Sequence, residues 1–154
     1  MVSVNRQLLL IVLASIFLFI QSEEAIGHWD MEARLWAEGG NEKFLLRIHN
    51  GEHANRKPTK KDLKVCFWIE DAGEGNNRLV SEKKCSTVII KPDEWMTFEF
   101  SIRDIPINEA AKSQGKLKAG KYRAVAQARE QRGWFMKLIL GAAMERVYNY
   151  FEVK

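Results

Sequence analysis

The chain has 154 residues, of which 46% are hydrophobic and 29% charged, and its formal net charge is +4. This length allows one domain with a single core. The basic balance is mild and the basic residues are mixed with acidic ones, whereas a nucleic-acid-binding protein usually concentrates Lys and Arg on one face. The densest basic cluster, "RKPTKK" at 56–61, is interpreted as a solvated loop. No nucleic-acid partner is therefore expected.

The chain opens with a leader-like segment. Its first seven residues form a short, largely polar stretch with one positive charge, Arg6, and the apolar run "LLLIVLASIFLFI" follows. This order is typical of a secretory signal peptide. A transmembrane anchor is the alternative, but it needs about 20 apolar residues, more than this run offers. We therefore predict a signal peptide over residues 1–27 and a single domain over 28–154.

The cleavage site decides which residue becomes the new N-terminus. Ala25, Ile26 and Gly27 place small residues at the two key positions before His28, close to the small-x-small rule. A cut after Ser22 is the competing site. The favoured cut leaves His28 at the N-terminus of a secreted or periplasmic protein.

Alternation of apolar and polar side chains is the main signal in the remaining chain. It predicts about seven short strands, separated by turn residues such as Gly, Asn and Pro. Residues 108–117 have room for one helical turn. Short strands with turn signals between them indicate an antiparallel sandwich or barrel, and we predict an all-β, immunoglobulin-like β-sandwich. The strands are expected at 29–36, 43–49, 63–69, 85–91, 94–102, 122–128 and 146–153.

The two cysteines are expected to form a disulfide, because exported chains meet oxidising conditions. Cys66 and Cys85 lie in predicted strands, and the midpoint between them falls between Gly75 and Asn76. A symmetric hairpin turning there puts the cysteines directly opposite each other, within disulfide range. The alternatives are two reduced cysteines in separate strands or a metal site, which two thiols alone do not complete. The true immunoglobulin pattern bridges two facing sheets, so no family is assigned.

The segment "RGWFMKLILGAAM", residues 132–144, is too apolar for an ordinary loop between two strands. In one interpretation it is a short helix or folded loop that plugs one end of the sandwich. In the other it is an exposed tip that contacts a partner protein or, peripherally, a membrane surface. An extended strand pairing is the third option. The candidate interaction surface consists of Trp134, Phe135, Met136, Leu138 and Leu140.

No catalytic constellation stands out in the sequence. The motifs GxSxG and HExxH and a Gly-rich phosphate loop are absent from it. Asp93 and Glu94 are adjacent, and neighbouring residues in a strand point to opposite faces, so these carboxylates would not flank one bond. We therefore expect a non-enzymatic module that binds a protein or surface partner.

The three histidines, His28, His49 and His53, support an alternative function. A free N-terminal His28 offers its amine and an imidazole nitrogen to Cu(II), and His49 or His53 would supply a third nitrogen. Such a chelate resembles the copper sites of lytic polysaccharide monooxygenases and of small copper-resistance sandwiches. The resemblance covers only His28 and a second histidine, and it implies an exported copper-binding protein.

Overall fold

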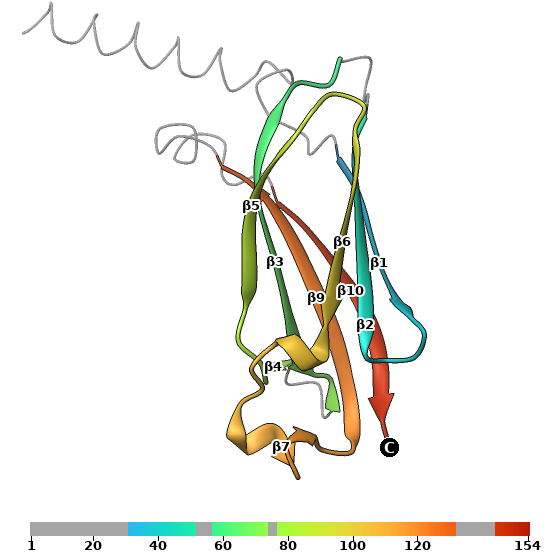
Figure 1. Cartoon of the computed structure of the whole chain (residues 1–154), viewed down its shortest axis with the longest axis vertical. Coiled ribbons are helices and arrows are strands. Elements are labelled where there is room, and N and C mark those ends of the chain that lie inside the picture. The colour runs from blue at the N-terminus through green and yellow to red at the C-terminus, as the bar shows by residue number, and fades with distance from the viewer. Residues whose placement is uncertain (1–30, 52–56, 74–76, 132–143) are drawn as a thin grey trace, which may run out of the picture.

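The computed structural model describes residues 31–51, 57–73, 77–131 and 144–154, with the side chains of residues 144 and 145 left aside. These residues form antiparallel β-sheets and short 3-10 turns, so the predicted all-β class is confirmed (Figure 1). Within the described ranges, no helix has the length and apolarity needed to cross a membrane. The predicted signal peptide and residues 132–143 lie outside the described residues.

The first sheet has three strands in the order β1-β2-β6. Gly39 and Gly40, both with positive φ, make the tight turn from β1 to β2, a conformation that glycine adopts without strain. The bounds are Met31–Glu38 for β1, Lys43–Asn50 for β2 and Trp95–Ser101 for β6. All three strands fall where alternation predicted them.

The second sheet has the order β10-β9-β3, with β4 and β5 pairing in turn along the far edge of β3. The bounds are Lys61–Asp71 for β3, Arg78–Leu79 for β4, Lys84–Ile90 for β5, Gly120–Glu130 for β9 and Met144–Val153 for β10. The four long strands of this sheet match the predicted ones, whereas the two-residue β4 was not predicted.

A compact excursion joins β6 to β9. It contains two 3-10 turns, Ile102–Asp104 and Glu109–Ala111, and a small hairpin of β7 (Lys112–Ser113) and β8 (Lys116–Leu117). Gln114 and Gly115 both have positive φ at the hairpin turn, as the common two-residue hairpin turn requires. The single helical turn envisaged for this region is thus a 3-10 turn followed by a hairpin.

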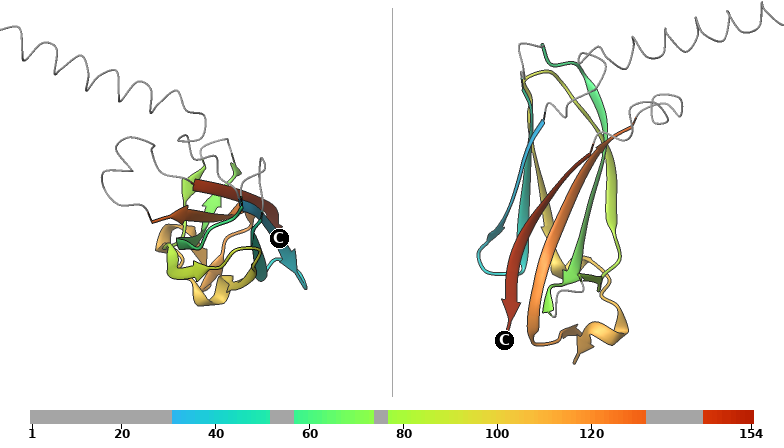
Figure 2. Two further views of the ribbon diagram at one scale, coloured as in Figure 1. Left: turned by 90° about the horizontal axis from the view of Figure 1, so that it is seen from above. Right: turned by 180° about the vertical axis from the view of Figure 1, so that it is seen from behind.

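The core lies between the two main sheets, which form separate layers (Figure 2). Phe67 of β3 stacks on Phe100 of β6, with ring centroids 4.6 Å apart, and Phe44 of β2 packs against Phe67 and Phe151. These contacts join the two sheets through side chains on their inner faces. The arrangement is consistent with a β-sandwich.

The immunoglobulin-like part of the prediction remains a prediction. β5 follows β3 along the chain and pairs with β3, whereas in the constant-type immunoglobulin arrangement the strand after the third joins the first sheet. β5 therefore belongs to the same layer as β3, β9 and β10.

The predicted disulfide is confirmed: Cys66 and Cys85 are directly opposed in the β3–β5 ladder and bonded, with Cα atoms 4.1 Å apart. The hairpin is not symmetric throughout. Glu70 pairs with Leu79 in β4, so the return strand holds two extra residues between its two pairing segments. Ser81 lies in this irregular stretch, and its hydroxyl accepts a hydrogen bond from the Ile69 amide at 2.8 Å. The serine thus satisfies a β3 donor where the regular ladder is interrupted.

Candidate interaction surface

The outer face of the second sheet turns away from the core. Strand register places its residues in rows that cross β3, β9 and β10. One row contains Trp68, Val125 and Tyr148, and the next contains Glu70, Arg123 and Tyr150. A solvent-facing sheet surface is usually polar, so a row with Trp, Val and Tyr is unusual.

Trp68 is 1% exposed although it lies on this outer face. It packs with Cys66 and Val125 in a small apolar cluster separate from the core. Two cations cover its ring: Lys83 Nζ lies 4.5 Å and Arg146 Cζ 5.4 Å from the ring centroid. Both distances are within the range of cation–π attraction. Among the described residues, Cys66, Val125 and two cationic side chains therefore contact this tryptophan.

Glu70 and Arg123 form a largely buried ion pair beside Trp68. One carboxylate oxygen, Oε2, lies 2.6 Å from Arg123 Nη2 and accepts from Arg123 Nε at 2.7 Å. The other oxygen, Oε1, accepts from the Trp68 indole N–H at 2.7 Å. Burial lowers the pKa of the Arg123 guanidinium, but its interactions with Tyr150 and Glu70 outweigh burial and raise that pKa overall. The network fixes the orientation of Trp68.

Two tyrosines extend this network to the surface. Tyr148 is 41% exposed and Tyr150 is 67% exposed. Arg123 Cζ lies 4.7 Å from the Tyr148 ring centroid. Tyr, Trp and Arg are the residues most enriched at the energetic centres of protein interfaces. The face thus combines exposed aromatic groups with a rigid polar base.

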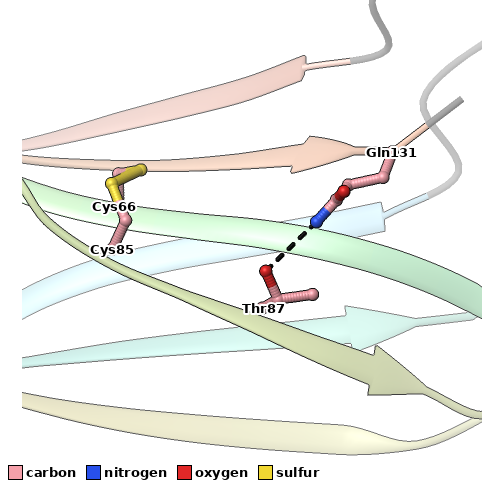
Figure 3. The surroundings of a disulfide bond; sticks show 4 residues. All are labelled: Cys66, Cys85, Thr87 and Gln131. Atoms are coloured by element: carbon pink, nitrogen blue, oxygen red, sulfur yellow. Dashed lines mark hydrogen bonds between the residues drawn. A yellow bond between two sulfur atoms is a disulfide. The ribbon is translucent and has the colours of Figure 1, made fainter.

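Cations surround the disulfide end of the same face. Lys64 and Arg129 are directly opposed across β3 and β9, and Arg146 lies opposite Gln127. Gln131 reaches across β3, and its side-chain amide donates to Thr87 Oγ1 of β5 at 3.2 Å (Figure 3). This contact links β9 to the disulfide-bonded edge strand.

The outer face of the first sheet has a different character. His49 stacks on Trp95 with centroids 4.1 Å apart, and Arg47 also lies over the Trp95 ring. Trp36 is 37% exposed on the same face. The cations are paired there: Arg34 with Glu32 at 2.5 Å, and Lys43 with both Glu38 and Glu99 at 3.0 Å.

A depression of about 1140 Å³ lies at the end of the sandwich near the C-terminus, between the β6–β9 excursion and the end of β10. Three of the five cations that line it have partners within the chain. Arg103 pairs with Glu42, and Lys112 pairs with Glu109. Lys118 donates to the carbonyl of Ala110. No aromatic side chain lines this depression among the described residues, whereas the outer face of the second sheet carries the exposed Tyr148 and Tyr150, so that face is the stronger candidate site.

The predicted site residues have different outcomes. Among the predicted copper ligands, His49 is described, and its ring is stacked on Trp95; His28 and His53 lie outside the described residues. In the ranges that the structure covers, no group of three or more His, Cys, Asp or Glu residues is placed to hold a metal ion. The predicted surface residues Trp134, Phe135, Met136, Leu138 and Leu140 also lie outside the described residues.

The outer face of the second sheet was missed from the sequence. The available signal was Trp68, an aromatic residue that alternation places on the opposite side of its strand from Phe67. Comparison with protein-family models gives no match. Comparison with curated proteins gives none either.

Proposed function

We propose that the protein is an exported, non-enzymatic module that binds a partner protein through the outer face of its second sheet. The observation that carries this proposal is the exposed Tyr148 and Tyr150 beside the Trp68–Glu70–Arg123 network. Such a rigid aromatic and arginine surface matches the chemistry of interface centres, where ordering costs little entropy. The disulfide suits an oxidising compartment, and the leader pattern supports export.

Site-specific photocrosslinking tests this proposal. A benzophenone amino acid replaces Tyr148 in one variant and Trp36 in another, since these side chains are 41% and 37% exposed on opposite faces. Each variant is irradiated in the fluid into which the protein is exported. We expect a discrete adduct with one protein from position 148 and none from position 36. Equal adducts at the two positions, or none at position 148, would contradict the proposal.

A further inference from the structure

Four exposed cations on the outer face of the second sheet lack a carboxylate partner among the described residues: Lys64, Lys83, Arg129 and Arg146. We call them the cationic cluster. Register and cation–π contacts place them around Gln127 and the Cys66–Cys85 bridge. Strand register puts three acidic residues of β3, β4, β5, β9 and β10 on this face. Glu70 is already paired with Arg123, Glu152 lies opposite Lys121 in the β9–β10 ladder, and Asp62 lies at the end of β3.

The cationic cluster contrasts with the first sheet. There Arg34 also lies opposite an arginine, Arg47, but Glu32 neutralises Arg34 and Trp95 covers Arg47. Lys64 and Arg129 face each other with no such relief from described residues. Like charges directly opposed in a sheet are destabilising. The outer face of the second sheet therefore retains a repulsion between opposed cations that the outer face of the first sheet avoids.

Two members of the cationic cluster, Lys83 and Arg146, are also preorganised. The carboxylate of Glu70 holds the indole of Trp68, and that indole holds Lys83 and Arg146 through cation–π contacts. Side chains held in this way lose less entropy when they bind an anion. An incoming carboxylate would find cations ordered on an exposed face beside Tyr148 and Tyr150.

We infer that the partner protein presents an acidic segment, rich in Asp and Glu, to the cationic cluster while apolar groups of the segment pack on Tyr148 and Tyr150. This inference rests on the proposed function. A second copy of the chain is a poor occupant, because two such faces would bring like charges together. The exposed Tyr148 and Tyr150 match the aromatic enrichment of protein–protein interfaces, which favours a polypeptide as the occupant.

Selection from a random peptide display library on the folded, oxidised protein tests the inference. We expect the enriched peptides to contain more Asp and Glu than the library. Their affinity should fall at least ten-fold in Lys64→Glu/Arg129→Glu and also when salt screens the charges. The control, Arg34→Glu/Lys116→Glu, changes the net charge equally at exposed positions outside the face and should bind as the parent does. Circular dichroism verifies that both variants are folded.

The outcomes separate this inference from the proposed function. Enriched peptides without excess acid, or acidic peptides that bind Lys64→Glu/Arg129→Glu as tightly as the parent, overturn the inference. If peptides that overturn the inference in this way still bind Tyr148→Ala more weakly than the parent, the proposed binding face is supported but its partner is not acidic. If they bind Tyr148→Ala and the parent equally, the face itself fails. Binding of a heparin oligosaccharide or an anionic vesicle with no acid-rich peptide selected also overturns the inference.

Discussion

Replacing Glu70 with glutamine should destabilise the domain more than any exposed charge change. The carboxylate accepts from the Trp68 indole with one oxygen and binds Arg123 with the other. Its side chain is 11% exposed and that of Arg123 is 14% exposed. Glutamine has nearly the same shape, so Glu70→Gln removes the charge and one acceptor without opening a cavity.

The size of the stability loss follows from the Arg123 guanidinium, which Glu70→Gln leaves buried without its carboxylate partner. Removing one partner of a buried ion pair costs about 3–5 kcal/mol, because the other charge stays buried and uncompensated. The slight exposure of both side chains reduces this figure through solvent screening. Trp68 and Arg123 donate to different oxygens of the carboxylate, and glutamine replaces one of those oxygens with an NH2 donor, so one of the two donors loses its acceptor. We therefore expect Glu70→Gln to lower the free energy of unfolding by about 3 kcal/mol.

Urea unfolding followed by far-UV circular dichroism measures this loss. The series is Glu70→Gln, Arg123→Met and Glu70→Met/Arg123→Met. The double variant should be more stable than either single one, because it removes both buried charges. Glu109→Gln, which breaks the exposed pair with Lys112, is the control and should change stability by less than about 0.5 kcal/mol. A loss under about 1 kcal/mol for Glu70→Gln would refute the reasoning.

Three further predictions concern the rest of the fold. Mass spectrometry of exported material should find a chain that begins at His28 and whose cysteines are not alkylated without reductant; full alkylation of the native protein would contradict the bridge. Replacing Cys66 and Cys85 with alanine should lower the free energy of unfolding by about 2–4 kcal/mol, measured by thermal unfolding. Asn50 is buried, and its amide donates to two backbone carbonyls at 2.8 and 2.9 Å, so Asn50→Asp should lower the melting temperature strongly at neutral pH, where the carboxylate would face those oxygens; an unchanged melting temperature would be inconsistent with that geometry. Burial raises the pKa of Tyr122, so the unfolded chain ionises first and stability should fall as pH rises above about 10; Tyr122→Phe should show a shallower fall, and equal slopes would count against it.

Alternation predicted the long strands because most of them bury one face against the other sheet, which leaves a period of two in the sequence. The edge strand β5 is the exception, since only Ile90 of it is buried. Cys66 and Cys85 followed from the same pattern, since the midpoint of a hairpin fixes its register. The two-residue β4 could not be predicted. Next to β4, the Ser81 hydroxyl accepts the hydrogen bond of the Ile69 amide in place of a backbone carbonyl. This contact forms only when β3 lies beside the return strand, so the sequence pattern does not reveal it.

The outer face of the second sheet was harder to predict because its contacts are distant in the chain. Glu70 and Arg123 are 53 positions apart, and Arg146 reaches Trp68 from a third strand. Alternation puts Trp68 on the opposite side of β3 from Phe67, and a side chain on that side is expected to be exposed. Only the assembled sheet shows that cations and a carboxylate enclose the indole.

The direction of the chain through the sandwich has a mechanical consequence. β1 begins at one end of the long axis and the C-terminus lies at the other (Figure 1). A pull on the two ends therefore runs along the strands. Ladder hydrogen bonds are perpendicular to antiparallel strands, so those of β1–β2 and β9–β10 would be sheared together rather than unzipped singly. The Cys66–Cys85 bridge joins positions 19 apart. Until it is reduced, the chain between the two cysteines cannot extend under force, which shortens the fully stretched chain by about 65 Å.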